Sequence, residues 1–301
     1  MEFCLGSFCA GDTVVFKGPM DIWTQMFAQY CHSCFDANQG AGIAVFTSNL
    51  WGKMKIGIIT YGSLESLDSG IRKIKRRFPQ AKISVINNKP GAAKADQIQG
   101  SNRDYEFGGY AEMVQFWSAE AQHGTSIPAT DGPFLLVNDT LFQTHYAQGW
   151  LDLVSLSLDT LHSSVFEVYG DIRRDGDSLA ERPDPFLASW FFLLPNRISL
   201  QRFSIALNQL LREPQPELSE GYRLFLENWL HPKGKWRGWQ GAAYPSEKER
   251  KIRCISLEHR LSRLMPLHQL QIVSMGHFGE NRYRILRLID RIRTRIKAWL
   301  G

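Results

Sequence analysis

Two short apolar segments separated by an amphipathic one most strongly constrain the fold of this chain. Residues 55–60 (KIGIIT) and 82–87 (KISVIN) have the β-branched composition of buried strands. Residues 64–78 between them repeat apolar side chains at helical spacing and end at Pro79. A strand, a helix and a second strand in this order form a parallel pair with a right-handed crossover. The pattern predicts an α/β fold.

A third cycle of the same kind follows. A helix is predicted over 109–120 and a strand over 134–137, and Asn138-Asp139-Thr140 follows that strand. In open α/β sheets, ligands bind outside the carboxyl ends of the strands. The polar residues that follow the three strands are therefore expected to line one cleft: Thr60, Tyr61, Asn87, Asn88, Asn138 and Asp139.

The second half of the chain is less regular. Strands are predicted over 163–168 and 188–194, with a polar loop over 170–185 between them. Helices are predicted over 198–211, 218–230, 246–264 and 280–300, interrupted by a loop at 231–244. We therefore expect a doubly wound, mostly parallel sheet in residues 54–200 and a helical C-terminal region in residues 201–301.

Residues 1–53 show no clear strand–helix–strand pattern and hold four of the five cysteines. Cys4, Cys9, Cys31 and Cys34, with His32 nearby, are compatible with a small zinc site, but the loose spacing of the first pair favours chance clustering. We treat this segment as an N-terminal appendage of uncertain role. Met54, directly before the first strand, has the position of a native start for such a fold.

The net charge of +5 is concentrated in residues 280–301, which contain seven basic and two acidic residues. Apolar residues there follow helical spacing, with arginines on a neighbouring flank and Trp299 near the end. Such a helix can bind the headgroups of an anionic membrane, or it can close the domain and leave its arginines in water. No nucleic-acid partner is expected, because the rest of the chain is formally neutral and no nucleic-acid motif occurs.

Several classes of protein are disfavoured by composition and by missing motifs. A hydrophobic fraction of 44% argues against disorder, and no run of eighteen apolar residues predicts a membrane-spanning helix. The first residues lack the pattern of a secretory leader, so we expect reduced thiols and a cytoplasmic location. Neither a G-x-S-x-G elbow nor a G-x-x-x-x-G-K-[ST] loop occurs, which leaves hydrolase and P-loop kinase functions without support.

Three segments go beyond a generic α/β pattern: 101–110 (SNRDYEFGGY), 134–140 (FLLVNDT) and 184–192 (DPFLASWFF). In order and spacing they resemble segments of bacterial polysaccharide glycosyltransferases of the rhamnan-synthesis F type. That family resembles GT-A-fold enzymes, which use a nucleotide-sugar version of the doubly wound sheet. The resemblance covers about residues 54–200 and implies a nucleotide-sugar donor and a glycan or lipid-linked acceptor.

The first of these segments has the chemistry of a donor-binding loop. Gly108 and Gly109 permit close backbone approach, and a helix that starts there directs its N–H groups at phosphate. Arg103 adds positive charge, and Asp104 or Glu106 can bond sugar or ribose hydroxyls. We therefore expect Asn102, Arg103, Asp104, Gly108 and Gly109 to line the donor, with ordinary turn chemistry as the alternative. The resemblance implies that Thr60-Tyr61 and Asn87-Asn88 hold the base and ribose, although many relatives have Asp-Asn where this chain has Asn87-Asn88.

The second segment is expected to meet the donor diphosphate. A leaving diphosphate gains negative charge, which a carboxylate-held cation or basic side chains can compensate. Related enzymes usually have a D-x-D-like motif at this position, and here it reads Asn138-Asp139. Asp139 is predicted to act on the diphosphate, with a helix N-cap as the alternative. It can still hold Mg²⁺ or Mn²⁺ through the diphosphate and waters, although one carboxylate in place of two counts against dependence on a metal.

The third segment and its surroundings are expected to serve the acceptor. Attack by an acceptor hydroxyl requires a base, for which Asp184 is the first candidate, ahead of Asp159, Glu167 and Asp171. Residues 236–239 (WRGW) can stack on a sugar or form a hydrophobic plug. His259, alone in a predicted helix, is expected to be a surface or capping residue.

Together these features predict a glycosyltransferase that moves a sugar from a nucleotide-diphosphate donor to a cell-surface polysaccharide or lipid-linked oligosaccharide. It would act at the inner face of the cytoplasmic membrane, held there by residues 280–301. The alternative is a non-catalytic, membrane-associated binding or assembly protein on a degenerate transferase fold.

Overall fold

The computed structural model describes residues 54–61, 64–122, 132–143, 147–158, 161, 166–173, 185–214, 217–230 and 245–300. All of them belong to one compact unit that begins at Thr47. The proposed zinc ligands and the rest of residues 1–53 lie outside the described residues.

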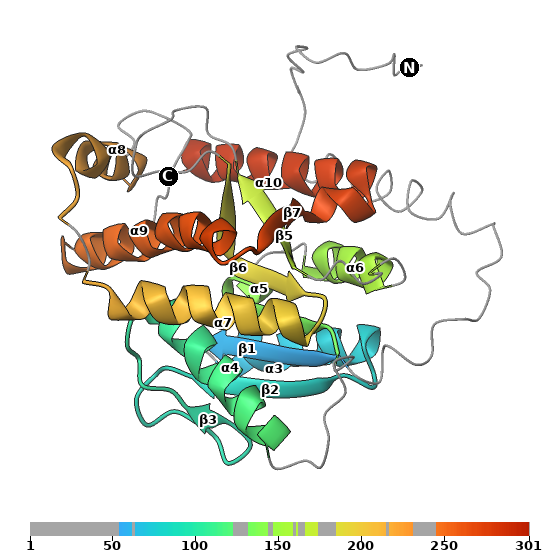
Figure 1. Cartoon of the computed structure of the whole chain (residues 1–301). Coiled ribbons are helices and arrows are strands. Elements are labelled where there is room, and N and C mark those ends of the chain that lie inside the picture. Colours follow the sequence, from blue (N-terminus) through green and yellow to red (C-terminus); the bar gives the residue numbers. More distant parts are fainter. Residues whose placement is uncertain are drawn as a thin grey trace, which may run out of the picture. The chain divides into compact units, whose positions relative to one another are not determined.

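The described strands form one sheet of seven strands, in the order β3-β2-β1-β4-β6-β5-β7 (Figure 1). From β3 to β4 all neighbours are parallel. β6 runs antiparallel to both β4 and β5, and β7 is parallel to β5. The bounds are β1 (Lys55–Thr60), β2 (Lys82–Asn87), β3 (Ile98–Gln99), β4 (Phe134–Asn138), β5 (Glu167–Arg173), β6 (Phe186–Leu194) and β7 (Gln271–Ser274).

Helices cover both faces of this sheet (Figure 1), which explains why β1 and β4 are almost continuous apolar runs. The bounds are α3 (Leu64–Arg77), α4 (Tyr105–Gln122), α5 (Thr140–Gln143), α6 (Ala147–Leu158), α7 (Arg197–Arg212), α8 (Glu220–Leu230), α9 (Pro245–Leu267), the 3₁₀ helix η1 (Met275–Phe278) and α10 (Glu280–Leu300). Asn196 starts α7 by accepting a 2.9 Å hydrogen bond from the Ser199 amide.

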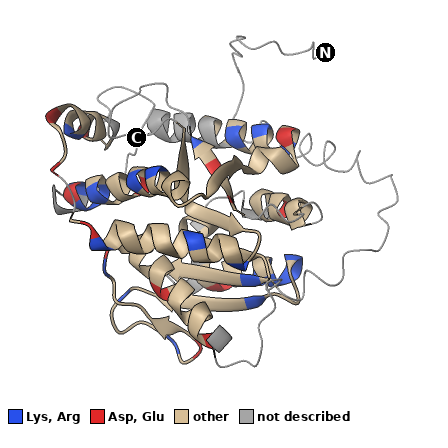
Figure 2. Ribbon diagram, viewed as in Figure 1, with Lys and Arg blue, Asp and Glu red and all other residues tan. Residues whose placement is uncertain are grey.

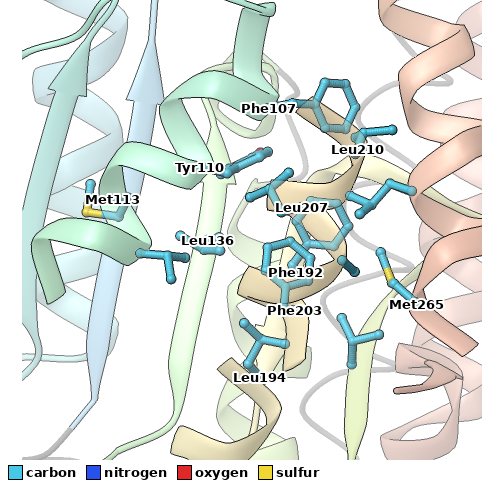
Figure 3. Close-up of a cluster of buried hydrophobic side chains, with 14 of the residues drawn as sticks. Phe107, Tyr110, Met113, Leu136, Phe192, Leu194, Phe203, Leu207, Leu210 and Met265 are labelled. Atoms are coloured by element: carbon cyan, nitrogen blue, oxygen red, sulfur yellow. The ribbon is translucent and has the colours of Figure 1, made fainter. Parts of the chain in front are cut away.

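One face of the sheet packs against α4, α7 and α9. Figure 3 shows Tyr110 and Met113 of α4, Phe203 of α7 and Met265 of α9 gathered around Phe192 of β6, and all five side chains are buried. The region after residue 200 therefore shares a hydrophobic core with the strands.

The opposite face packs against α3, α6, η1 and α10. Its buried side chains include Leu67 of α3, Leu151 of α6, Met275 of η1 and Leu286 of α10. Leu286 also lies close to Gly149, where an added Cβ would stand 2.5 Å from its Cδ2. The first half of α10 is thus part of the domain core.

The prediction of an α/β fold with a mostly parallel sheet is confirmed. The strands expected at 55–60 and 82–87 are found at those positions. Part of the strand expected at 163–168 lies outside the described residues. β5 spans Glu167–Arg173, so the expectation of a loop from residue 170 onward is wrong for Gly170, Asp171, Ile172 and Arg173. β3 and β7 were not predicted, and β7 adds residues 271–274 to the same sheet. No helix in the described part of the chain is long and apolar enough to cross a membrane.

Candidate functional site

The carboxyl ends of β1 and β4 are joined by Asp139. Its Oδ2 accepts hydrogen bonds from Thr60 Oγ1 at 3.2 Å and from the Tyr61 amide at 3.1 Å. Its own amide donates to the carbonyl of Ile59 at 3.0 Å. The chain moves outward from β1 to β2 and β3 and then returns to β4 on the other side of β1. Asp139 therefore lies where the strand order reverses, the ligand-binding position of doubly wound sheets.

Asp139 does not use its carboxylate as a helix cap. The side chain that bonds the first amide of α5 is Asn138, whose Oδ1 accepts from Thr140 N at 3.0 Å. Burial raises the pKa of Asp139 and the charge of Glu106 adds to the rise, while hydrogen bonds from Tyr61 and Thr60 oppose it. This carboxylate is half-buried and close to a second acid, an unusual combination for a residue that only ends a strand.

The two asparagines after β2 differ in their surroundings. Asn87 is engaged in turn contacts, since its Oδ1 accepts from the Lys89 amide and its Nδ2 donates to the carbonyl of Ala92. Asn88 is fully buried and donates to the carbonyl of Tyr105 at 3.4 Å. Asn88 Oδ1 is buried without a hydrogen-bond partner among the described residues. Burial raises the pKa of the neighbouring Tyr61 hydroxyl, and a hydrogen bond from the Asn88 side chain opposes that rise.

The loop before α4 folds back on the first turn of that helix. Asn102, Asp104 and Tyr105 all have positive φ values, between 53° and 58°. A Cβ at Gly108 would stand 1.9 Å from the carbonyl oxygen of Arg103, so this close approach requires glycine. Three non-glycine residues in the left-handed region within one short loop represent local strain, which is concentrated at functional sites in proteins.

Within this loop, the expected donor-binding side chains have different partners. Asn102 and Arg103 are exposed, whereas Asp104 forms a 2.7 Å ion pair with Arg253 of α9. Gly109 lies against β1, where a Cβ would stand 2.6 Å from Ile59 Cγ2. The structure therefore brings Gly109 to the ends of β1 and β2, whereas Asp104 pairs with α9 and the exposed Asn102 and Arg103 have no described contact with these strand ends.

A buried polar cluster beside Asp139 was not foreseen. Glu106 of α4 accepts hydrogen bonds from Ser189 Oγ of β6 at 3.0 Å and from Cys254 Sγ of α9 at 3.1 Å. The Ser189 amide donates to Oε1 of Glu258, also on α9, and its carbonyl accepts from Tyr110 Oη at 2.7 Å. We refer to Thr60, Tyr61, Asn88, Glu106, Asp139 and Ser189 together as the carboxyl-edge site.

Helix α9 supplies further ionisable groups to this cluster. Burial lowers the pKa of Lys251, but Cys254, Glu106 and Glu258 outweigh it, so the pKa of Lys251 is raised. Burial raises the pKa of Glu258, although the Ser189 amide opposes this. Burial and the charge of Glu106 hold the pKa of the Cys254 thiol well above its ordinary value. Glu106 and Ser189 both lie in segments that the sequence singles out, whereas α9 has no local motif that marks Lys251, Cys254 or Glu258.

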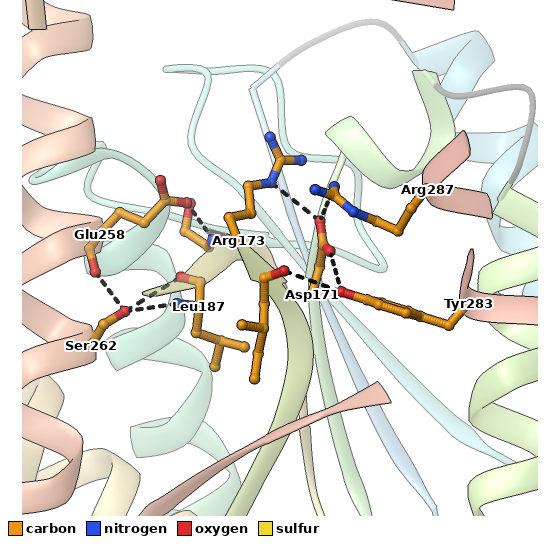
Figure 4. A network of polar contacts seen from close by, with 9 residues as sticks. Asp171, Arg173, Leu187, Glu258, Ser262, Tyr283 and Arg287 are labelled. Carbon is orange, nitrogen blue, oxygen red and sulfur yellow. Dashed lines mark hydrogen bonds and ion pairs between the residues drawn. The ribbon is translucent and has the colours of Figure 1, made fainter. Parts of the chain in front are cut away.

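A second charged cluster surrounds Asp171 on β5 (Figure 4). Its carboxylate is fully buried and lies 3.2 Å from Arg173 Nε and 3.3 Å from Arg287 Nη1 of α10. The Tyr283 hydroxyl is 3.3 Å from Asp171 Oδ1. The register of β5 against β6 shifts between Gly170 and Ile172, a bulge that turns Asp171 toward α10. Asp171, a base candidate, is engaged in joining α10 to the sheet.

The other base candidates are not part of the carboxyl-edge site. Glu167 begins β5, at the opposite edge, and accepts a hydrogen bond from Tyr169 Oη. Asp159, Asp184 and residues 236–239 lie outside the described residues. The expectation that His259 is a surface or capping residue is wrong: it is buried, with Nδ1 2.5 Å from Tyr222 Oη and its ring against Phe186.

A divalent cation at Asp139 would need further oxygen ligands beside this carboxylate. No three His, Cys, Asp or Glu side chains are grouped among the described residues. In phosphate-binding sites Mg²⁺ is held by one or two carboxylates together with the substrate phosphates and water. Asp139 Oδ2 is already bonded to Thr60 and Tyr61. The described side chains do not by themselves form a cation site.

No family model matches this chain, and no curated protein or solved structure matches it either. The chemistry of the carboxyl-edge site is therefore inferred from its own contacts and from the resemblance of three short segments.

Proposed function

We propose that this protein is a GT-A-like glycosyltransferase that transfers a sugar from a nucleotide-diphosphate donor to a cell-surface polysaccharide or a lipid-linked oligosaccharide. The observation that carries the proposal is the position of Asp139. Its half-buried carboxylate bonds Thr60 and the Tyr61 amide where the strand order reverses between β1 and β4. Doubly wound sheets bind nucleotides at this point.

Convergence of the three family-like segments supports the same function. Glu106 comes from the first segment, Asp139 from the second and Ser189 from the third. Ser189 Oγ donates to Glu106 at 3.0 Å, and the charge of Glu106 contributes to the raised pKa of Asp139. Segments that are separate in the sequence thus share one edge of the sheet, as the donor site of such an enzyme requires.

The groups at this edge match the parts of a nucleotide sugar. Asn88 Oδ1 is a polar atom without a described partner, and the Asn88 and Tyr61 side chains beside it have the chemistry to bond ribose or base. The first turn of α4 has backbone N–H groups and an exposed Arg103 beside it, which suit phosphate. We assign no step of the proposed transfer to a divalent cation, because the described side chains do not by themselves form a cation site. Dependence on Mg²⁺ or Mn²⁺ stays a prediction, as does Asp184 as the acceptor base.

The experiment that tests the proposal compares donor binding with transfer. Thermal stabilisation of the full chain is measured with a panel of nucleoside diphosphates, with and without Mn²⁺, and transfer is then assayed with the matching nucleotide sugars. We expect one nucleotide to stabilise the wild type, and Asp139→Ala to lower transfer about 100-fold or more. Binding without transfer would instead support the non-catalytic alternative, and no stabilisation by any nucleotide would contradict both donor binding and transfer.

We further propose that α10 holds the enzyme at the inner face of the cytoplasmic membrane. Its first half packs in the core through Leu286, and Arg287 bonds Asp171, so Arg287 is not on a solvated flank. The membrane-binding charge is therefore assigned to Arg291, Arg293, Arg295 and Lys297. Replacing these four with Gln should abolish flotation with vesicles containing phosphatidylserine, whereas Arg282→Gln with Arg284→Gln should weaken it less. Unchanged flotation of the fourfold variant would overturn the proposal.

A further inference from the structure

The N-terminal half of α9 reaches the carboxyl-edge site with a guanidinium group. The Arg250 guanidinium carbon lies 5.6 Å from the ring centre of Tyr61 and 4.9 Å from that of Tyr105. Tyr61 directly follows β1, and Tyr105 begins α4. Arg250 is therefore held beside the two elements that are expected to bind the donor.

Lys and Arg residues are distributed along α9 (Figure 2). The basic neighbours of Arg250 each interact with an acidic side chain. Lys248 pairs with Glu227 at 3.4 Å, Arg253 pairs with Asp104 at 2.7 Å, and Lys251 lies near Glu106 and Glu258. Arg250 is exposed and has no carboxylate within ion-pair distance in the part of the chain that the structure describes. It is a positioned cation whose charge is not compensated there.

Its surroundings favour an anion with several oxygens. Two aromatic faces orient the planar guanidinium by cation–π contact and leave its N–H edges for another partner. A guanidinium presents a fork of donors that fits two phosphate oxygens at once. Arg250 is thus suited to a phosphate group at the carboxyl edge.

We propose that Arg250 binds the diphosphate of the donor and supplies positive charge that a carboxylate-held cation would otherwise provide; this inference depends on the proposed glycosyltransferase function. In the transfer, the acceptor oxygen forms a bond to the anomeric carbon as the bond from that carbon to the diphosphate oxygen breaks. The electron pair of the broken bond remains on the diphosphate, and the acceptor proton passes to a base. Arg250 keeps its protons and stabilises the charge on the departing diphosphate.

The proposal accounts for the single acid at Asn138-Asp139. Asp139 is the single carboxylate where related enzymes usually have two, and Arg250 can supply positive charge to the diphosphate in addition to any cation. Binding of the diphosphate should then persist when divalent cations are removed.

The test measures affinity by isothermal titration of the full chain with UDP, GDP and dTDP and with the matching nucleosides, all in EDTA. We expect one diphosphate to bind, and Arg250→Gln to weaken it roughly 10- to 100-fold while the affinity for its nucleoside changes less than about twofold. The affinity of Arg250→Lys for the diphosphate should lie between those of the wild type and Arg250→Gln, because an ammonium group keeps the charge but lacks the planar fork of donors. Arg263→Gln, which removes the same charge from an exposed position of the same helix, should bind like the wild type.

Equal affinity of the wild type and Arg250→Gln, or binding that disappears in EDTA and returns with Mn²⁺, would overturn the role of Arg250 and leave the proposed function intact. A wild type that binds no nucleoside diphosphate, with or without Mn²⁺, would contradict the proposed function itself. Because Arg250 is exposed, its variants should retain the wild-type melting temperature within a few degrees.

Discussion

The hydroxyl of Ser189 donates a 3.0 Å hydrogen bond to Oε1 of Glu106, a residue 83 positions earlier in the chain. This bond joins β6 to α4 beside Asp139. It also satisfies one acceptor of a carboxylate that is 8% exposed. When a buried carboxylate loses a hydrogen-bond donor, the free-energy cost of its desolvation is no longer compensated.

Replacing Ser189 with Ala should therefore lower the free energy of unfolding by about 1–3 kcal/mol, as measured by urea denaturation. The matched control is Ser118→Ala on α4, where the hydroxyl bonds the carbonyl of Val114 in its own helix, and it should change stability by less than about 0.5 kcal/mol. Equal losses in the two variants would contradict the importance of the Glu106 contact.

The pKa of Asp139 predicts a stability that depends on pH. Burial raises this pKa above its ordinary 3.8. The folded chain then keeps a proton that the unfolded chain loses, so the contribution to stability is present below 3.8 and is lost as pH rises through the raised pKa. Asp139→Asn removes this loss. The free energy of unfolding of the variant minus that of the wild type should increase between about pH 3 and about pH 7.

Urea titrations at both pH values measure this difference, and a transfer assay on the same samples should show reduced activity. Asp68→Asn is the control, because Asp68 forms an exposed pair with Lys94 and its removal should cost less than about 1 kcal/mol. A difference for Asp139→Asn that stays flat or decreases with pH would show that the carboxylate is not penalised in the folded state.

Arg287 and Arg284 lie on the same helix but differ in burial. Arg287 pairs with Asp171, a carboxylate that is 1% exposed, whereas Arg284 pairs with Glu280 at the surface. Arg287→Met should lower the free energy of unfolding by about 1–3 kcal/mol, because Asp171 is left with Arg173 and Tyr283. Arg284→Met should cost less than about 0.5 kcal/mol. Thermal or urea unfolding distinguishes them, and similar values would contradict the contact with Asp171.

Two glycines provide a test of the strained loop before α4. At Gly108 an added Cβ would stand 1.9 Å from the carbonyl oxygen of Arg103, whereas at Gly221 of α8 nothing lies within 4 Å. Gly108→Ala should displace the loop, lower stability by about 1–3 kcal/mol and weaken nucleotide binding. Gly221→Ala should raise stability by up to about 1 kcal/mol, because Ala is the better helix former. Unaltered binding in Gly108→Ala would exclude the loop from the site.

The parallel half of the fold could be predicted because its signals are local. β1 and β2 are short apolar runs, Pro79 follows the helix between them, and parallel strands must bring their carboxyl ends to one edge. That rule was enough to place Thr60, Asn88 and Asp139 together. It could not assign the cap of α5, because Asn138 and Asp139 are both good capping residues and only the geometry shows that Asn138 takes that role.

The remainder of the site depends on contacts that leave no local pattern. Ser189 reaches the carboxyl edge because β6 runs antiparallel to β4, and Cys254, Glu258 and Arg250 arrive on a helix that begins at residue 245. The sequence predicts a loop at Asp171 and Arg173, because a strand that buries a charged residue looks polar in sequence. Arg287, the partner of Asp171, lies 116 positions further along the chain.

The sulfur of Cys254 and the carboxylate of Glu106 are separated by 148 residues, and this separation has a consequence for the timing of folding on the ribosome. β1, β2, β3 and β4 come from consecutive segments, so all of their residues have been synthesised once residue 138 is added. α9 follows more than a hundred residues later, an interval on the order of ten seconds at usual rates of synthesis. During that interval Asp139 has been synthesised and Arg250 has not. Because α9 contributes Arg250 to the site, we expect donor binding only after α9 has packed against the sheet.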